Sequence, residues 1–270
     1  MNNLQKHLST SLLATAALLV GAFPASAAEV SLGSASNFAV LGGTNVTCTA
    51  GSVVTGDVGV SPGSAVPFTN TGCTIAGATP PATNAAAAQA RTAFLKAYAA
   101  IQLMSCTLVS GTLANQNLAP GVYCLDSVAK AGTLTLTGPA SGVWVFRVNG
   151  ALTATDFSVV MAGGGQPCNV FWAPSDAATL TDSLLKGNIL AGGATLGSIT
   201  MTGGTLAGRA LARIAVTMTG SSVIGCGALS GSSSCNAGDD GDDDDDGGKD
   251  NKKCDNKDDH DCKPEHKGDK

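Results

Sequence analysis

Histidine is missing from almost the whole chain. The three histidines are His7, His260 and His266, so residues 8–259 contain none. Without an imidazole, this long central region cannot assemble a Ser-His-Asp triad or a His/Cys zinc site. Gly59 to Gly63 matches the G-x-S-x-G pattern of a nucleophile elbow. We interpret it as a Gly/Pro corner, because no base is available to activate Ser61.

Charge is also scarce in the central region. Residues 28–230 carry six acidic and seven basic side chains. The carboxylates are too scattered to form a glycosidase pair, and no basic patch supports nucleic-acid binding. No phosphate loop or dinucleotide fingerprint follows a predicted strand. We therefore expect neither an enzyme nor a protein that holds a cofactor or a metal.

Long apolar runs are absent apart from one near the start. Ser11 to Phe23 is apolar but too short to span a bilayer comfortably. Lys6 precedes it and Ala25-Ser26-Ala27 follows it, which is the pattern of a signal peptide with its cleavage site. The sequence thus predicts a signal peptide over 1–28 and a secreted protein without a membrane span, released to the periplasm, the cell surface or the medium.

The other end of the chain lacks bulky apolar residues. Residues 231–270 hold fourteen acids and seven lysines among glycine and serine. Such a segment cannot bury enough surface to offset its ordering entropy. We expect a disordered acidic tail over 231–270 and one domain over 29–230.

What this domain has instead is short β-branched runs between glycines. From Gly187 to Val223 the runs NILA, SITM and IAVTM alternate with Gly-containing corners. The same alternation is present in residues 132–165 and 168–193. Each run has the length of one strand and each corner the composition of a turn. This pattern is typical of a β-solenoid. Aromatic residues are only 4% of the chain, so the interior is expected to be filled mainly by Val, Leu, Ile and Ala.

One segment is helical by composition. Residues 83–104 are rich in Ala, Gln, Lys and Leu, and an apolar stripe recurs at helical spacing through Ala87, Ala90, Phe94, Tyr98 and Ile101. A helix of this size measures roughly 33 Å. Six stacked coils measure roughly 29 Å. The helix is therefore long enough to lie along the whole solenoid.

The nine cysteines are consistent with an oxidising compartment. Plausible pairs are Cys48 with Cys73, Cys106 with Cys124, Cys168 with Cys226, and Cys254 with Cys262. Spacing alone does not fix the connectivity, and the odd number leaves at least one thiol over.

Several motifs in a fixed order resemble the DUF3494 ice-binding proteins. They are LGSASNFAVLGG (32–43), VVTGDVGVSPG (53–63), LAPGVY (118–123), CNVFW (168–172), and GNILA (187–191) with GRALAR (208–213). The resemblance implies a mostly β fold, an irregular (discontinuous) right-handed β-solenoid with one long helix packed alongside. Residues 73–81 would form a small capping loop at one end. It also implies a non-catalytic, monomeric protein whose partner is the surface of an ice crystal.

Threonine and serine at strand positions are the candidate site. Alternate strand residues share a face, so Thr153 would lie beside Thr155 and Thr181 beside Ser183. Thr205 and Ser221 would continue the same column. A flat, charge-poor grid of hydroxyls and methyls suits the ordering of water into an ice-like layer.

The family carries T-A/G-x-T/N on this face, and two carboxylates depart from that motif here. Asp156 stands in place of Thr or Asn, and Asp182 follows Thr181. A carboxylate on the face would disturb an ordered water layer. We therefore expect modest antifreeze activity, stronger in blocking recrystallisation than in depressing freezing. The alternative is a structural or adhesive cell-surface solenoid that has lost strong ice affinity.

Overall fold

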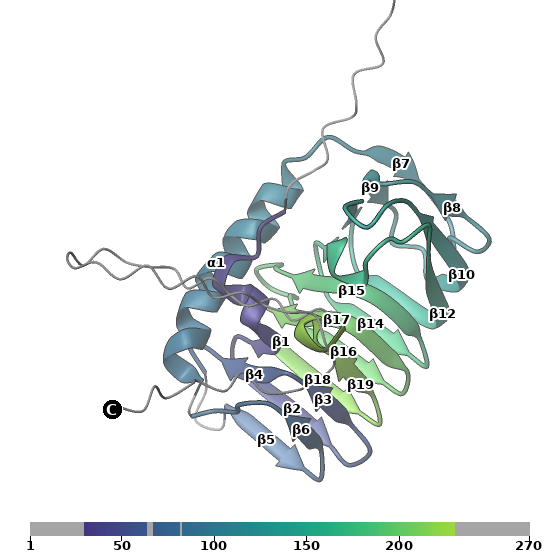
Figure 1. Cartoon of the computed structure of the whole chain (residues 1–270). Coiled ribbons are helices and arrows are strands. Elements are labelled where there is room, and N and C mark those ends of the chain that lie inside the picture. Colours follow the sequence, from purple (N-terminus) through teal and green to yellow (C-terminus); the bar gives the residue numbers. More distant parts are fainter. Residues whose placement is uncertain (1–29, 64–66, 82, 230–270) are drawn as a thin grey trace, which may run out of the picture. The chain divides into compact units, whose positions relative to one another are not determined.

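The computed structural model describes residues 30–63, 67–81 and 83–229, which contain the solenoid and its helix (Figure 1). The expected signal peptide, the acidic tail and the Cys254–Cys262 pair lie outside the described residues. Every described strand pair is parallel, and the strands stack into one long sheet that folds into three faces. This confirms the predicted mostly β solenoid. No helix of the described part is long and apolar enough to cross a membrane.

The first face is here called the helix-covered face. Its strands are β4 (Asp57–Val60), β1 (Phe38–Gly42), the second halves of β17 (Thr205–Ala212) and β15 (Leu184–Ala191), β13 (Val170–Pro174), β11 (Trp144–Val148), β9 (Gly121–Leu125) and β7 (Thr107–Val109). The face is buried on both sides in β1, β13 and most of β11, and is more accessible in β9 and β7.

The second face, here called the threonine face, alternates between buried and accessible residues. Its strands are β5 (Phe68–Thr71), β2 (Asn45–Thr49), β18 (Ala215–Thr219), β16 (Ile199–Thr202), β14 (Ala178–Thr181) and the first half of β12 (Leu152–Ala162).

The third face completes each coil. Its strands are β6 (Thr74–Ala76), β3 (Val53–Thr55), β19 (Ser222–Ile224), the first halves of β17 and β15, the second half of β12, β10 (Lys130–Thr137) and β8 (Asn117–Leu118).

The stacking order of the coils differs from the order of the sequence. β1 lies between β4 and β17, β2 between β5 and β18, and β3 between β6 and β19. The N-terminal coils therefore continue the stack after the last C-terminal coil. Residues 73–81 close that end, where the Val58 N–H donates to the Ala78 carbonyl. This discontinuous arrangement is the one that the family resemblance implies.

Helix α1 (Asn84–Gln102) runs along the helix-covered face from the N-terminal coils to β7 (Figure 1). It buries Ala87, Ala90, Phe94, Ala97 and Ile101. They pack against strand residues that include Phe38, Leu41, Val145, Phe171, Leu190 and Leu211. Three of the five buried helix residues are alanines, so the helix can approach the sheet closely.

The predicted stripe is confirmed apart from one position. Tyr98 is only half-buried, and its hydroxyl donates to the Pro174 carbonyl at 3.2 Å. The expected helix over 83–104 begins one residue later and ends two residues earlier, at Asn84 and Gln102.

Inside the coils the core is aliphatic, with a small aromatic stack. Phe146 stacks on Trp172 at 4.1 Å between ring centroids and on Tyr123 at 5.6 Å. In the coil near the β7 end, Lys130 takes the inward position opposite Ala154 and is 1% exposed. Its ammonium donates to Asp126 Oδ1 and to the Gly111 carbonyl, both at 2.8 Å. The hydrogen bond from Lys130 lowers the pKa of Asp126.

Three disulfides staple the domain. They join Cys48 with Cys73, Cys106 with Cys124, and Cys168 with Cys226, which confirms the three pairs expected within the domain. Two 3-10 helices are described, η1 (Gly33–Asn37) before β1 and η2 (Pro167–Asn169) before β13. α2 (Cys226–Leu229) follows β19.

Candidate functional site

Each strand of the threonine face presents two threonines separated by one residue. In five of the six strands the residue between them is buried in the core, because side chains alternate across a strand, whereas Asn70 on β5 is exposed. The six pairs are Thr69 and Thr71, Thr47 and Thr49, Thr217 and Thr219, Thr200 and Thr202, Thr179 and Thr181, and Thr153 and Thr155. All twelve side chains are exposed or half-exposed.

The strand register aligns these pairs into two straight ladders. One ladder runs through Thr153, Thr179, Thr200, Thr217, Thr47 and Thr69. The other runs through Thr155, Thr181, Thr202, Thr219, Thr49 and Thr71. Thr219 is placed beside Thr49 by the pairing of Met218 with Cys48. We call these twelve residues the threonine array.

The dimensions of the array follow from strand geometry. Neighbouring rows are about 4.8 Å apart, and the two ladders are about 6.8 Å apart, twice the rise per residue. Six rows thus extend over about 24 Å. Buried inward residues such as Leu180, Met201, Val216 and Met218 hold the strands from below. The array is therefore a regular two-column grid on a packed support.

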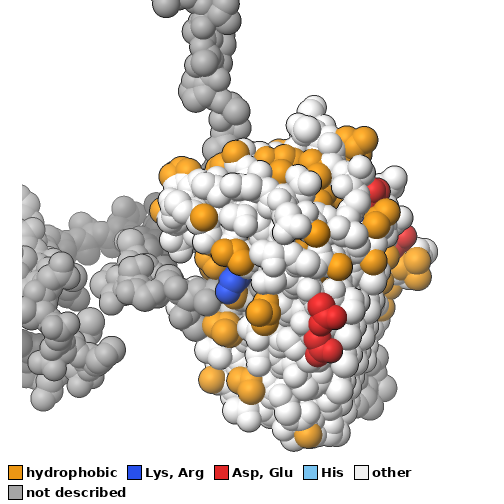
Figure 2. All heavy atoms as spheres, turned by 90° about the vertical axis from the view of Figure 1, so that its right-hand side faces the viewer, with side chains coloured by type: hydrophobic (Ala, Val, Ile, Leu, Met, Phe, Trp, Pro, Cys, Tyr) orange, Lys and Arg blue, Asp and Glu red, His pale blue; other side chains and the backbone are white. Residues whose placement is uncertain are grey.

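The column beside the first ladder is small and uncharged. A third column beside the first ladder consists of Ala151, Ala177, Ser198, Ala215, Asn45 and Pro67, as the pairing of the adjacent residues shows. Figure 2 looks at the edge where the strands turn, and its described surface carries few charged side chains. No residue of the three columns is acidic or basic. The surface thus lacks groups that would hold their own tight hydration shells.

Two carboxylates stand at the edge of the array. Asp156 and Asp182 directly follow Thr155 and Thr181, and both adopt a left-handed backbone with φ of 49° and 48°. The chain turns at these residues toward the third face. Asp156 lies within β12 and Asp182 in the bend between β14 and β15, so neither belongs to the two ladders, although both are exposed beside them. The expectation that these carboxylates disturb the water layer stays a prediction.

Of the six residues predicted from sequence, the structure brings three together in the array: Thr153, Thr155 and Thr181. Ser183 is only 2% exposed, and its hydroxyl donates to the Thr181 carbonyl and accepts from the Phe157 N–H. The pairing of Ser183 with Thr181 on one face is wrong, because the turn at Asp182 directs Ser183 inward.

The other two predicted residues also lie off the array. Ser221 is fully buried behind the next turn. Thr205 begins β17 on the third face, half-buried between Leu184 and Ser222. The column predicted from the sequence placed Thr181 in the position that corresponds to Thr153. In the structure, Thr153 pairs with Thr179 instead. This two-residue difference in register moved the predicted column into the turns.

Nine array threonines were missed from sequence. Their signal is the tripeptide Thr-x-Thr, in which the middle residue is Leu, Met, Cys, Asn or Ala, followed by a turn. The tripeptide also occurs in Thr133 to Thr137, which lies on the third face in β10. The motif alone thus identifies strands but not the face that they share.

The titratable groups with shifted pKa values lie away from the array. Burial lowers the pKa of Arg209 to about 10, on the helix-covered face. Burial raises the pKa of Tyr98 on α1, and the nearby Asp176 adds to this shift. Among the described residues no three His, Cys, Asp or Glu side chains are grouped as metal ligands. The three columns themselves contain no titratable side chain.

A model of the ice-binding-like family matches residues 40–224. An ice-binding protein of Nostoc sp. (strain HG1) is 39% identical over 173 residues, which cover 62% of this chain and 64% of the relative. An ice-binding protein of Flavobacterium frigoris (strain PS1) is 34% identical over 178 residues, covering 60% of this chain and 64% of the relative. The chain thus spans less than two thirds of these two relatives.

Solved structures show the same fold. The ice-binding protein from an Antarctic biological consortium superposes with a TM-score of 0.63 and 34% identity, covering 72% of this chain and 90% of that chain. The ice-binding protein of the Antarctic ascomycete Antarctomyces psychrotrophicus gives a TM-score of 0.61 and 32% identity, covering 73% and 98%.

Proposed function

The chain belongs to the ice-binding-like family, and from this premise we propose that its solenoid adsorbs to ice through the threonine array. The observation that carries the proposal is the register of six parallel strands, which aligns twelve threonines in two ladders. The protein would act outside the cell as a monomer. The three disulfides support this location, because such bonds persist in oxidising compartments.

The chemistry of the array suits a crystalline water surface. Each threonine exposes a hydroxyl that accepts and donates hydrogen bonds and a methyl that water cannot bind. Hydroxyls at fixed intervals anchor water molecules, and the methyls between them limit disordered hydration. Because the β ladder fixes the positions of the hydroxyls before binding, little conformational entropy is lost on adsorption. Bound molecules then force the ice front to curve between them, which opposes growth.

The position of the carboxylates changes the expected strength of the activity. The sequence predicted modest activity because Asp156 and Asp182 would interrupt the ordered water layer. Asp156, a left-handed residue within β12, and Asp182, in the bend after β14, lie beside the ladders, and the columns of the array contain no charge. We therefore propose that the whole array is available to ice.

The proposal is tested by a bulky substitution at the centre of the array. Thr200 is exposed in the third row from the β12 end. Thr200→Tyr should lift the face from the crystal and lower thermal hysteresis and recrystallisation inhibition. We expect most of both activities to be lost.

The matched control is Thr133→Tyr, which places the same ring at an exposed strand position of the third face. It should leave both activities at the level of the unsubstituted protein. Equal loss in both variants would show that the threonine face is not the ice-binding surface. If the folded, unsubstituted protein shows neither thermal hysteresis nor recrystallisation inhibition, the structural or adhesive solenoid is favoured instead.

A further inference from the structure

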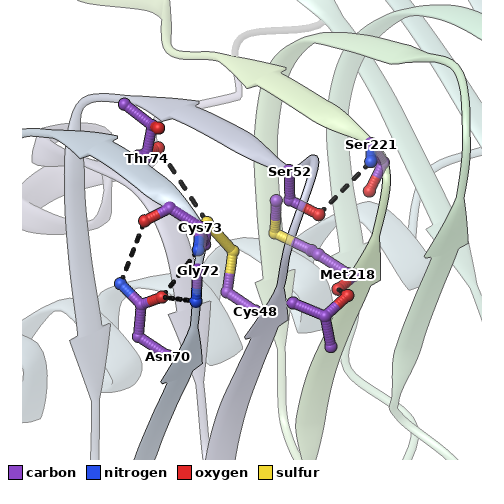
Figure 3. The surroundings of a disulfide bond; sticks show 9 residues. Cys48, Ser52, Asn70, Gly72, Cys73, Thr74, Met218 and Ser221 are labelled. Carbon is purple, nitrogen blue, oxygen red and sulfur yellow. Dashed lines mark hydrogen bonds between the residues drawn. A yellow bond between two sulfur atoms is a disulfide. The ribbon is translucent and has the colours of Figure 1, made fainter.

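The Cys48–Cys73 disulfide lies beneath one end of the threonine array (Figure 3). Cys48 sits on β2 between Thr47 and Thr49, points inward and is 1% exposed. Cys73 is half-buried in the turn that follows β5, and the two Cα atoms are 5.6 Å apart. The bond therefore ties the fifth row of the array to the strand that carries the sixth.

The sixth row, Thr69 and Thr71, has less support than the other rows, although Phe68 of β5 and Ile75 of β6 are half-buried and pack against the core. Among the described strands β5 pairs with β2 alone. No residue of β5 or β6 is fully buried, whereas each of the other five rows stands over buried apolar side chains such as Leu180 or Met201. An edge strand without a buried anchor opens locally at low cost.

The inward position that would supply this anchor is polar. Asn70 lies opposite Cys48 in the register. Its side-chain oxygen accepts from the Gly72 and Cys73 N–H groups at 3.1 and 2.8 Å, and its amide donates to the Cys73 carbonyl at 3.1 Å (Figure 3). Asn70 therefore shapes the turn that presents Cys73 to Cys48. The fully buried part of the core stops one row before the array does.

We propose that the Cys48–Cys73 disulfide is a positioning element of the ice-binding face, a role that rests on the function proposed above. It holds Thr69 and Thr71 in the plane of the other five rows and thereby sets the length of the array. Without it the edge row leaves that plane for part of the time. The contact with ice is then shorter, although the other five rows keep their packed support.

The other two disulfides provide matched controls. Cys106–Cys124 joins the segment after α1 to β9 on the helix-covered face. Cys168–Cys226 joins η2 to α2. None of these four cysteines belongs to a strand of the threonine face. Their removal takes away a covalent link without touching a row of the array.

The experiment compares Cys48→Val/Cys73→Ser with Cys106→Val/Cys124→Ser in the full chain. Valine is chosen at position 48 because it is apolar, fills the space of the buried Cys48 side chain and favours the β-strand backbone. The first variant should keep part of its thermal hysteresis, losing less than Thr200→Tyr does. Hydrogen exchange of the backbone amides of residues 68–76 should become faster. The second variant should keep the full hysteresis and the slow exchange of this segment.

A third comparison separates positioning from general stabilisation. Thr71→Tyr should lower hysteresis in the native background and cause a smaller further loss without the Cys48–Cys73 bond, because the row is then already out of plane. Equal losses in both backgrounds would overturn the proposal. So would full hysteresis in Cys48→Val/Cys73→Ser.

Failure of the proposed function and failure of the positioning role give different results. Absence of hysteresis in the unsubstituted protein would refute the proposed function, while the exchange of residues 68–76 would still report on the positioning role. If Cys48→Val/Cys73→Ser does not fold, dithiothreitol can reduce the native bond. Both cysteines become thiols and the reagent becomes a cyclic disulfide. Unchanged protection of residues 68–76 after this reduction would overturn the proposal, and faster exchange would support it.

Discussion

At the residue scale, threonine satisfies two demands of the exposed face at once. Its β-branched side chain favours the extended backbone, so twelve copies do not strain the strands that carry them. Its methyl and hydroxyl give every grid point both an apolar and a polar group. Aspartate has a different use here, since Asp156 and Asp182 take a left-handed conformation that few non-glycine residues adopt.

The backbone of Asp182 leads to a prediction about stability. Asp182→Ala should lower the free energy of unfolding by about 1 kcal/mol, because alanine lacks the side chain that eases a left-handed turn. Asp182→Asn should leave stability near the native value, since asparagine tolerates this conformation. Urea unfolding of the two variants measures the difference. Equal midpoints would contradict the role assigned to the turn.

Asp182→Asn also tests whether the carboxylate at the edge affects ice binding. Asp182→Asn removes the charge and keeps the turn, so it should leave thermal hysteresis unchanged if Asp182 stands outside the contact with ice. A clear rise in hysteresis would mean that the carboxylate does disturb the water layer, as the sequence suggested.

At the scale of the element, the Thr-x-Thr strands and α1 belong to different faces of the coil. The strands form the threonine face, and α1 packs on the helix-covered face. The strand buries its middle residue and offers two threonines to solvent. The helix buries Phe94 and four smaller residues against the helix-covered face. Support and contact surface are thus separate elements, and changes in one need not alter the other.

This separation predicts a stability defect without a binding defect. Phe94→Ala removes a fully buried ring and should cost about 3–5 kcal/mol. Measured near the freezing point, where the folded fraction is still high, hysteresis should match that of the native protein. Thr92→Ala, on the exposed side of the same helix, should change stability by less than about 0.5 kcal/mol. Loss of hysteresis in a folded Phe94→Ala sample would show that α1 acts on the threonine face.

At the scale of the whole molecule, the array depends on the discontinuous path of the chain. Rows on β2 and β5 come from the N-terminal part, and the next row on β18 comes from the C-terminal part. Four rows become six only because β2 pairs with β18. A continuous solenoid that lacked this return would carry a shorter array.

The junction can be tested with a pair of neighbouring threonines. Thr47 and Thr217 are register partners although they lie far apart in the sequence. Thr47→Tyr and Thr217→Tyr should each remove most of the hysteresis. The double variant should be little worse than either single one, because adjacent rings block the same part of the face.

Thr47 with Thr153, at opposite ends of one ladder, is the control pair. Its two losses should be closer to additive, because the rings are several rows apart. Normal hysteresis in Thr47→Tyr would exclude the N-terminal rows from the binding face.

The sequence by itself determined the solenoid and its helix, and it made the disulfide pairs plausible without fixing them. Glycine corners between β-branched runs predicted the strands, and the stripe from Ala87 to Ile101 predicted the buried side of α1. These features depend on local periodicity and composition, which short-range physics fixes. The three cysteine pairs within the domain were plausible from spacing and were found as expected.

Only the tertiary structure decided which threonines share a face. Thr-x-Thr occurs in β16 and β18 on the threonine face and equally in β10 on the third face. Ser183 lies two residues after Thr181 and yet is buried, because one left-handed residue turns the chain between them. Alternation predicts the direction of a side chain only while a strand continues. Where a strand turns, and which distant strand lies beside it, follows from the packing of complete coils.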